Sequence, residues 1–210
     1  MQTQVIAATD PDAIDKACQL LGAGGLVAFP TDTVYGVGAD AFQPGAVEKI
    51  YEVKGRPLAK AIPLLIDKAE NLHMIAEHIP EAAWALAKRF WPGALTVVLH
   101  RKPEVPDIVT GGGATIAVRV PDHSFALGLI RAAGGVLAVT SANLSGCPDP
   151  TTAGEVMGYL ESRIELILDG GRCPGGIPST VIDLTSTPPS VVRLGAIPRH
   201  ELAKQLACLQ

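Results

Sequence analysis

Two short segments carry side chains suited to binding phosphate, Lys54-Gly55-Arg56-Pro57 and Ser141-Ala142-Asn143. Lysine and arginine donate charge-assisted hydrogen bonds to phosphate oxygens, and the hydroxyl and the amide add neutral donors. Pro57 biases Arg56 towards an extended backbone, in which alternate residues point to the same side, so we expect Lys54 and Arg56 to face one ligand. Together these side chains predict a site for a nucleoside triphosphate. The alternative for each segment by itself is a solvated helix end and an ordinary turn.

The segments that must position these side chains alternate between helix and strand. A helix that opens at Pro44 has apolar residues along one face and delivers Lys54 at its far end. The apolar run 135–140 reads as a buried strand, so Ser141 and Asn143 would emerge side by side at its end. The other expected strands are 26–29, 62–66, 94–100, 115–120, 165–168, 180–184 and 191–193, and the other expected helices are 11–21, 80–90, 123–133 and one after the capping box Thr152-x-x-Glu155. This order predicts an α/β fold with a twisted mixed β-sheet flanked by helices.

The composition indicates a globular chain with a large aliphatic core. Hydrophobic residues make up 48% and charged residues 18% of its 210 residues, and no linker divides it, so we expect one domain over 1–210. No apolar run approaches the roughly 18 residues of a membrane helix, and the first residues do not resemble a signal peptide, so we expect no membrane and a cytoplasmic location. A net charge of −4 argues against broad coating of nucleic acid but leaves room for a local basic site.

Several familiar site patterns are absent from the sequence. The four cysteines and five histidines show no C-x-x-C or H-E-x-x-H spacing, so a transition metal held by the protein has little support. The phosphate-binding G-x-x-x-x-G-K-[ST], the dinucleotide-binding G-x-G-x-x-G and the hydrolase G-x-S-x-G are missing as well. Two glycine-rich stretches, 111–113 and 170–176, precede Thr115 and Ser179, and we expect them to bring backbone close to a ligand.

Five motifs occur in an order that resembles the YrdC family: 30–36 (PTDTVYG), 54–57 (KGRP), 118–123 (VRVPDH), 140–146 (TSANLSG) and 179–183 (STVID). The likeness covers nearly the whole chain and is similar to the single-domain, YrdC-like form of that family. It implies an L-threonylcarbamoyladenylate synthase, a nucleotidyltransferase that makes threonylcarbamoyl-AMP and pyrophosphate from L-threonine, bicarbonate or CO2, and ATP with Mg2+. The product serves threonylcarbamoyladenosine synthesis on tRNA, through downstream tRNA-modifying proteins, and tRNA itself is a further candidate partner.

The resemblance also assigns roles to individual side chains. It implies catalytic roles for Lys54, Arg56, Ser141 and Asn143, and contacts to ATP from the same four residues together with Lys60, Thr115 and Arg193. It implies threonine contacts from Thr33, Arg119, Val139 and Ser179, with Arg119 suited to pairing in two-donor fashion with the carboxylate.

Some readings stay open on the sequence alone. Arg119 could instead bridge to a surface carboxylate, and Thr31 could be either a turn hydroxyl or a ligand contact. Some family members have Asn at the position of Lys60 and His at that of Leu65, so one threonine contact is either missing or supplied differently. Rival functions are a non-enzymatic RNA-binding module, a carbamoyl-adenylate former of hydrogenase maturation that uses carbamoyl phosphate, and a low-activity paralogue.

Overall fold

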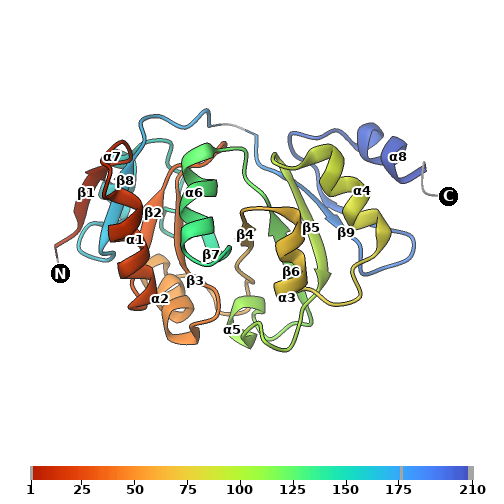
Figure 1. The fold of residues 1–210 in the computed structure, drawn as a ribbon, viewed down its shortest axis with the longest axis horizontal. Coiled ribbons are helices and arrows are strands. Elements are labelled where there is room, and N and C mark those ends of the chain that lie inside the picture. The colour runs from red at the N-terminus through yellow and green to blue at the C-terminus, as the bar shows by residue number, and fades with distance from the viewer. Residues whose placement is uncertain (1, 176, 208–210) are drawn as a thin grey trace.

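A computed structural model describes residues 2–175 and 177–207, and its strands join in one sheet (Figure 1). The strands are β1 (Gln4–Ala7), β2 (Val27–Phe29), β3 (Gly36–Asp40), β4 (Leu64–Ile66), β5 (Leu95–His100), β6 (Thr115–Arg119), β7 (Val136–Ser141), β8 (Leu166–Asp169), β9 (Thr180–Asp183) and β10 (Ser190–Arg193). Their order across the sheet is β1-β8-β2-β3-β7-β4-β6-β5-β9-β10. The pairs β1–β8, β2–β8, β4–β6 and β5–β9 are parallel and the other pairs are antiparallel, so the predicted mixed sheet is confirmed.

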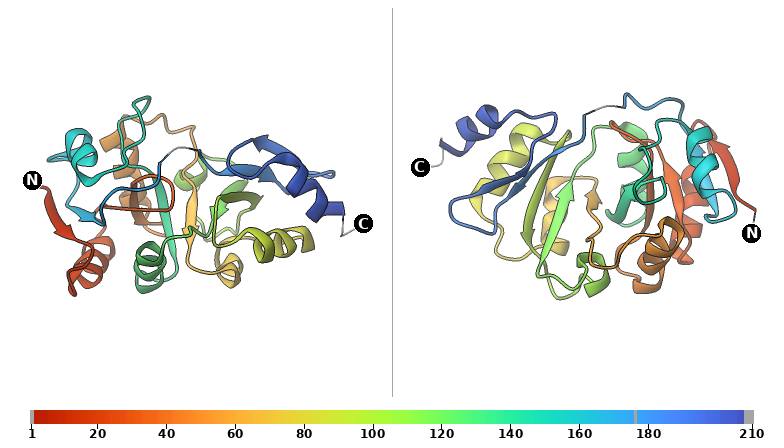
Figure 2. Two further views of the ribbon diagram at one scale, coloured as in Figure 1. Left: turned by 90° about the horizontal axis from the view of Figure 1, so that it is seen from above. Right: turned by 180° about the vertical axis from the view of Figure 1, so that it is seen from behind.

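Helices cover both faces of this sheet. They are α1 (Ala13–Gly22), α2 (Pro44–Lys54), the 3-10 turn η1 (Ala69–Asn71), α3 (Leu72–Ile75), α4 (Glu81–Phe90), α5 (Asp107–Thr110), α6 (Ser124–Ala132), α7 (Ala153–Leu160) and α8 (Arg199–Ala207). In Figure 1 α1 and α6 lie in front of the sheet, whereas the rear view in Figure 2 has α2 and α7 in front. Each side has its own core because alternate strand residues point to opposite faces. Val27 packs with Leu21 and Leu129, and its neighbour Ala28 belongs to the cluster of Ile50 and Val156.

Each strand and helix expected from the pattern is present, with ends that shift by a few residues. The capping box at Thr152 and Glu155 is confirmed. The first helix begins at Ala13 rather than at Pro11, because the Asp10 carboxylate accepts a hydrogen bond from the Asp12 N–H and holds a turn there. The elements that the sequence did not predict are β1, β3, η1, α3, α5 and α8. The strand β3 reads Gly-Val-Gly-Ala-Asp, in which Val37 is the one strand-forming residue, and pairing with β2 and β7 decides its conformation.

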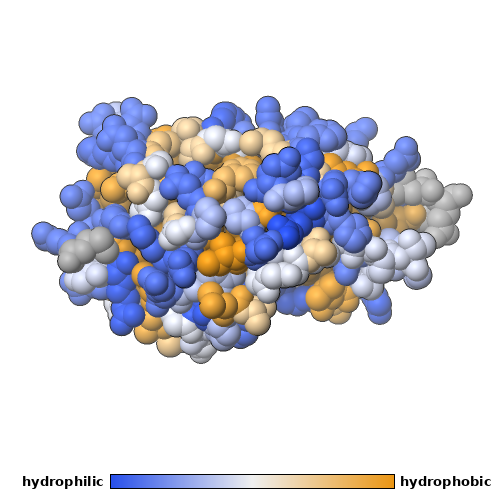
Figure 3. Space-filling view, turned by 90° about the horizontal axis from the view of Figure 1, so that it is seen from below, coloured by the Kyte–Doolittle hydropathy of each residue, from blue (hydrophilic) through white to orange (hydrophobic). Residues whose placement is uncertain are grey.

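The surface seen from below is mainly hydrophilic, and its hydrophobic side chains form small separate groups (Figure 3). Isolated exposed apolar residues of this kind are ordinary on folded proteins. Within the described residues, no helix combines the length and the apolar character needed to cross a membrane.

Candidate functional site

A cavity of about 380 Å³ opens on the sheet face that carries α6, where Leu65 and Val139 line it. Its wall combines the β2–β3 loop with residues of the strands β3, β4, β5, β6, β7, β9 and β10. The predicted site residues in this wall are Thr33, Arg56, Arg119, Val139, Ser141, Ser179 and Arg193. The predicted site residues outside it are Lys54, Lys60, Thr115 and Asn143. The structure therefore brings together residues that lie up to 160 positions apart in the chain.

Lys54 lies behind the cavity wall rather than facing a ligand. Its side chain is buried, and Nζ donates to the carbonyl oxygens of Ser141 (2.5 Å) and Asn143 (2.6 Å) and to Asn143 Oδ1 (3.1 Å). Burial, and next the charge of Arg56, lowers the pKa of Lys54 to about 8, while Asp149 and Cys147 oppose the fall. The expectation that Lys54 points into solvent or ligand is therefore wrong, and its ammonium group holds the end of β7 in place.

Arg56 does reach the cavity. Helix α2 ends at Lys54, and Gly55 has a left-handed backbone (φ 58°), so the chain turns instead of continuing in the extended geometry that the proline suggested. The side chains of Lys54 and Arg56 therefore diverge. The Arg56 guanidinium donates to the carbonyls of Lys60 (3.1 Å) and Ala61 (2.8 Å), and this leaves further N–H donors for a ligand.

Ser141 and Asn143 form one hydrogen-bonded turn after β7. The Ser141 hydroxyl donates to Asn143 Oδ1 (2.7 Å), and Asn143 Nδ2 donates to the Cys147 carbonyl (2.6 Å) and to Asp149 Oδ1 (3.2 Å). Asn143 is buried and its amide is fully engaged, whereas Ser141 lines the cavity. Asn143 therefore shapes the turn that presents Ser141 and Asp149.

Arg119, at the end of β6, is 8% exposed and forms part of the cavity wall. Nη2 donates to Asp32 Oδ2 (2.5 Å) and Nε donates to the Gly93 carbonyl (2.9 Å), while Nη1 only approaches Thr33 Oγ1 at 3.5 Å. Burial lowers the pKa of Arg119, and the charge of Asp32 opposes that change. The sequence left open whether Arg119 binds a ligand or pairs with a surface carboxylate. In the structure it pairs with the carboxylate of Asp32, which is largely buried rather than on the surface.

A second group of polar side chains lines the part of the cavity formed by β5, β10 and the residues just before β9. Thr96 Oγ1 and Ser179 Oγ are 2.8 Å apart, and Arg193 Nη2 donates to Ser179 Oγ (3.1 Å) and to the Ser179 carbonyl (2.9 Å). The parallel pairing of β5 with β9 sets this contact, because it aligns Thr96 with the start of β9. All three side chains line the cavity.

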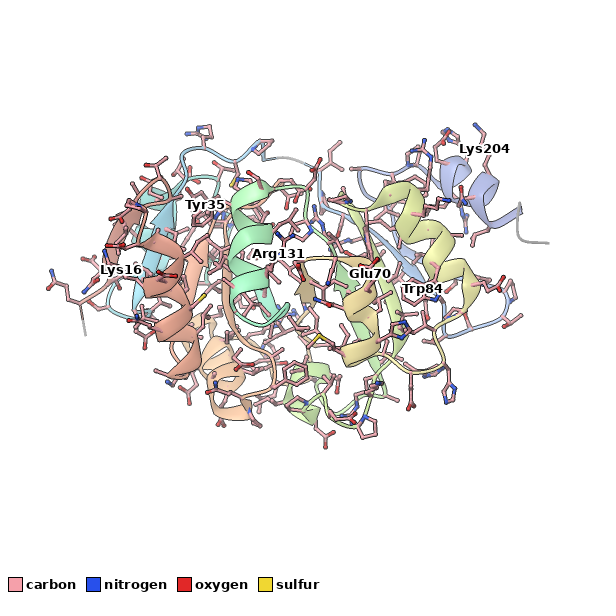
Figure 4. All side chains as sticks on the ribbon, in the orientation of Figure 1. Lys16, Tyr35, Glu70, Trp84, Arg131 and Lys204 are labelled. Atoms are coloured by element: carbon pink, nitrogen blue, oxygen red, sulfur yellow. The ribbon has the colours of Figure 1, made fainter. Side chains whose placement is uncertain are left out.

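The β2–β3 loop is held by its own threonines and by Tyr35. Thr31 Oγ1 donates to the Val34 carbonyl (2.7 Å), so its role as a turn hydroxyl is confirmed, although Thr31 also lines the cavity. The hydroxyl of Tyr35, which is labelled in Figure 4, donates to the Gly171 carbonyl (2.7 Å) and ties this loop to the segment after β8. At Gly36 a Cβ atom would lie 2.6 Å from Val139, so only glycine fits where the loop enters β3.

Lys60 and Thr115 lie away from these groups. Lys60 is exposed in the loop after Arg56. Thr115 begins β6 opposite His100, four residues from Arg119, which corresponds to about 13 Å along a strand. The expectation that the glycine-rich stretch 111–113 lies close to the ligand is not met, since none of its residues lines the cavity.

Sequence reasoning did not single out Asp32, Thr96 or Asp149, and of these Thr96 and Asp149 line the cavity. Asp32 lies inside the 30–36 motif and supports the wall through Arg119, and its acidic side chain between two threonines was the available signal. Thr96 is the polar residue of the run 95–99, which otherwise reads Leu-Val-Val-Leu, and this is a weaker signal. Asp149 follows no recognisable pattern, and the turn around Asn143 alone brings it to the cavity.

Among residues 2–175 and 177–207, no group of three or more His, Cys, Asp or Glu side chains is placed to hold a metal ion. A magnesium ion that arrives with ATP needs fewer protein ligands, because phosphate oxygens and waters complete its octahedron. Asp149 lines the cavity and is linked to Ser141 through Asn143, so one carboxylate of the required kind is present beside the predicted phosphate-binding group.

Comparisons with known proteins give consistent results. The chain is 49% identical over 181 residues to a threonylcarbamoyl-AMP synthase of Pyrococcus abyssi, covering 86% of this chain and 53% of that protein. It is 34% identical over 208 residues to a putative threonylcarbamoyl-AMP synthase of Mycobacterium tuberculosis, covering 97% of this chain and 95% of that protein. The chain thus spans about half the length of the Pyrococcus relative and nearly all of the mycobacterial one.

Solved structures share the fold. The crystal structure of P. abyssi Sua5 complexed with L-threonine matches with a TM-score of 0.89 and 47% identity, covering 92% of this chain and 57% of that one. The crystal structure of E. coli YciO matches with a TM-score of 0.83 and 29% identity, covering 93% of this chain and 97% of that one. A family model described as "Telomere recombination" matches residues 19–195. By these matches, the chain belongs to the Sua5/YciO/YrdC family.

Proposed function

We propose that this chain forms threonylcarbamoyl-AMP and pyrophosphate from L-threonine, bicarbonate or CO2, and ATP. The observation that carries the proposal is a single cavity whose wall holds Arg119 beside Thr33 as well as Arg56 and Ser141. Two separate cationic groups of this kind suit a substrate carboxylate and a triphosphate bound together. The relatives named threonylcarbamoyl-AMP synthase, and the similar structure that contains L-threonine, support the same assignment.

The proposed reaction has two steps. The neutral amine nitrogen of threonine attacks the carbon of CO2 and gives up a proton to water, which leaves a carbamate. A carbamate oxygen then attacks the α-phosphorus of ATP, the bond to the bridging oxygen breaks, and pyrophosphate leaves with the electron pair. Positioning and neutralisation of charge supply most of the catalysis in such a transfer.

The residues have distinct parts in this proposal. Arg56 and Arg193 neutralise phosphate charge, and Ser141 donates a hydrogen bond to a phosphate oxygen. Lys54 and Asn143 act by holding the turn that presents Ser141. Thr33, Arg119, Val139 and Ser179 form the threonine side, and for Lys60 and Thr115 we propose no contact in this conformation. Magnesium bound to the phosphates would neutralise further charge, with Asp149 as its protein carboxylate.

The wider assignment rests on the same reaction. Threonylcarbamoyl-AMP is an activated carbamate, and a downstream tRNA-modifying protein must pass its threonylcarbamoyl group to tRNA. We therefore infer action in the cytoplasm, with such proteins as partners and tRNA as a further candidate ligand. The continuous sheet supports treating 1–210 as one YrdC-like domain.

Release of pyrophosphate from ATP tests the function. We expect it to require both L-threonine and bicarbonate, because the nucleophile is built from them. Equal release without threonine would contradict the proposal, and activity with carbamoyl phosphate in place of threonine and bicarbonate would favour the hydrogenase-maturation alternative. Binding of tRNA without any pyrophosphate release would favour the RNA-binding module.

A further inference from the structure

The segment that carries Arg56 to the cavity is held by residues that lie outside the cavity. We call residues 55–61, between α2 and β4, the Arg56 loop. Arg56 itself is half-buried and lines the cavity, whereas the other six residues of the loop are exposed. A loop with so little burial depends on its neighbours for a fixed backbone. Its neighbours include α2 and α5, which pack side by side in Figure 1.

The guanidinium of Arg56 is bonded to the backbone of its own loop. Nε donates to the Lys60 carbonyl (3.1 Å) and Nη2 donates to the Ala61 carbonyl (2.8 Å). The Lys60 N–H donates to the Pro57 carbonyl (3.0 Å) and closes a turn between them. The guanidinium therefore moves with the backbone of residues 57–61. A displacement of this backbone displaces the cation that the proposed function assigns to phosphate.

One support of the loop comes from α2. Tyr51 is 3% exposed, and its hydroxyl is directed at the Lys60 carbonyl (3.0 Å) and at the Ile108 carbonyl of α5 (2.8 Å). A carbonyl oxygen has two lone pairs, so the Lys60 carbonyl accepts from Tyr51 and from Arg56 together. The Tyr51 hydroxyl thus fixes the same carbonyl that orients the guanidinium.

The other support is the glycine-rich turn that ends α5. Gly111 has a left-handed backbone (φ 62°), and a Cβ atom there would lie 2.9 Å from the Leu58 carbonyl oxygen and 3.0 Å from the Ala59 carbonyl group. These are backbone atoms, which cannot rotate away as a side chain can, so the loop would have to shift. At Gly112, which also has a positive φ (84°), a Cβ atom would meet nothing within 4 Å. Only Gly111 therefore lets the two backbones approach.

We propose that Gly111 and Tyr51 are positioning residues for the nucleotide, because they hold the Arg56 loop where the guanidinium of Arg56 faces the phosphates of ATP. Neither residue lines the cavity, so each acts through Arg56. The inference rests on the proposed function, in which Arg56 neutralises phosphate charge. It gives the stretch 111–113 a role at a distance from the ligand.

The variants Gly111→Ala and Gly112→Ala form a matched pair. Both place alanine at a positive φ and carry the strain of that backbone, but only Gly111→Ala meets the Arg56 loop. Calorimetric titration with α,β-methylene-ATP and magnesium measures nucleotide binding without turnover. We expect the Kd of this analogue to be at least about tenfold higher in Gly111→Ala than in Gly112→Ala, because a charge-assisted contact is misplaced. Equal values in the two variants would overturn the role of Gly111.

The Kd of L-threonine without nucleotide shows whether the effect is confined to the nucleotide. We expect it to stay within about twofold of the wild type in both glycine variants, since a tenth of the free energy of a lost contact is at stake on that side at most. Loss of threonine binding together with nucleotide binding in Gly111→Ala would mean that the glycine only supports the fold.

Arg56→Ala separates positioning from a general loss of structure. If Gly111 acts through Arg56, then Gly111→Ala made in the Arg56→Ala protein should raise the nucleotide Kd by less than about twofold, because the group that it misplaces is already gone. A purely structural effect does not depend on Arg56. The full effect of Gly111→Ala in both backgrounds would therefore contradict the inference.

Tyr51→Phe tests the second support and keeps the ring in the core. We expect the nucleotide Kd to rise about threefold or more with an unchanged threonine Kd, because the Lys60 carbonyl loses its bond to α2. Tyr159→Phe, at a half-buried tyrosine of α7, which packs on β8, is the control and should bind nucleotide like the wild type. If Gly111→Ala does not fold, a wild-type nucleotide Kd in Tyr51→Phe overturns the inference.

The outcomes separate this inference from the proposed function. If the wild-type protein binds the ATP analogue but releases no pyrophosphate that depends on threonine, the proposed function fails, and the glycine pair still decides the inference. If pyrophosphate release depends on threonine and bicarbonate, but the glycine pair binds the analogue equally, the function stands and the inference is wrong. A wild-type protein that does not bind the analogue would contradict both.

Discussion

Lys54 Nζ lies 2.6 Å from the carbonyl oxygen of Asn143, and this contact joins two motifs that are 89 residues apart. A second bond, to the Ser141 carbonyl, fixes the other side of the same turn. The buried lysine thus holds the backbone that presents Ser141 to the cavity. Lys54, which the sequence suggests as a phosphate-binding residue, thus supports the segment that contains Ser141, whereas Arg56 of the same motif reaches the cavity.

Replacing Lys54 should therefore affect stability as well as activity. In Lys54→Met three acceptors lose one donor each, and although Asn143 Oδ1 keeps the Ser141 hydroxyl, loss of donors to buried acceptors costs on the order of 1–3 kcal/mol. We expect that loss in urea unfolding, together with at least a tenfold lower rate of pyrophosphate release. Lys60→Met, at an exposed lysine, is the control and should unfold like the wild type. Unchanged stability of Lys54→Met would mean that these contacts contribute little.

The lowered pKa of Lys54 predicts a pH dependence of stability. The folded protein releases the Lys54 proton near pH 8, whereas the unfolded chain keeps it up to 10.5. Between these values the unfolded state binds more protons, so the contribution of Lys54 to the free energy of unfolding increases with pH and is constant below about pH 8. Relative to Lys54→Met, we expect the wild type to gain on the order of 2 kcal/mol from pH 7.5 to 9.5. A difference that is flat with pH would refute the lowered pKa.

Arg56 should matter for activity and little for folding. Its guanidinium is half-buried at the cavity and, within the described part of the chain, bonds only to carbonyls of its own loop. We expect Arg56→Ala to lower the rate more than tenfold through the loss of one charge-assisted contact worth about 1.5–3 kcal/mol, with nearly unchanged thermal stability. Lys88→Ala, which removes an exposed charge on α4, should keep the wild-type rate. Near-normal turnover in Arg56→Ala would remove it from the nucleotide site.

Substitutions at Arg119 and at Ser141 should weaken the binding of different substrates. Arg119→Lys keeps the charge but loses the planar two-donor fork, so threonine affinity should fall while ATP affinity changes little. Ser141→Ala should weaken ATP and leave threonine binding without nucleotide nearly intact. Calorimetric titration of each variant with each ligand measures both effects. If Arg119→Lys bound threonine normally but had lost ATP, the two assignments would have to be exchanged.

Asp67 should stabilise the join between β4 and α6. Its side chain is 2% exposed, and it accepts hydrogen bonds from Asn71 Nδ2 (2.6 Å) and from Nε of Arg131, which is labelled near the centre of Figure 4. We expect Asp67→Ala to lower the free energy of unfolding by about 1–3 kcal/mol, because it leaves the Asn71 amide with only the longer hydrogen bond to the Gly135 carbonyl (3.3 Å). Arg131→Ala should cost less than about 1 kcal/mol, because Arg131 is 70% exposed. Urea unfolding of both variants checks the order, and equal losses would contradict it.

The sequence by itself determined those helices and strands whose local sequence preference matches the conformation that the tertiary structure imposes. Apolar runs such as 136–140, the opening of α2 at Pro44 and the capping box at Thr152 each predict structure within a few residues. The ordered motifs also identified most of the cavity wall, since Thr33, Arg119, Ser141 and Ser179 lie in it.

Only the tertiary structure decided which way these side chains point and what they contact. The left-handed turn at Gly55 sends Lys54 under the turn at Ser141 and Arg56 into the cavity, which an i, i+2 rule cannot anticipate. The pairing of Asp32 with Arg119 joins the β2–β3 loop to the end of β6, 87 residues away, and depends on the strand order of the sheet. Thr115 lies away from the cavity because it begins the strand that Arg119 ends. Local patterns report on residues that are near in the chain, whereas these contacts arise from strands that meet only after folding.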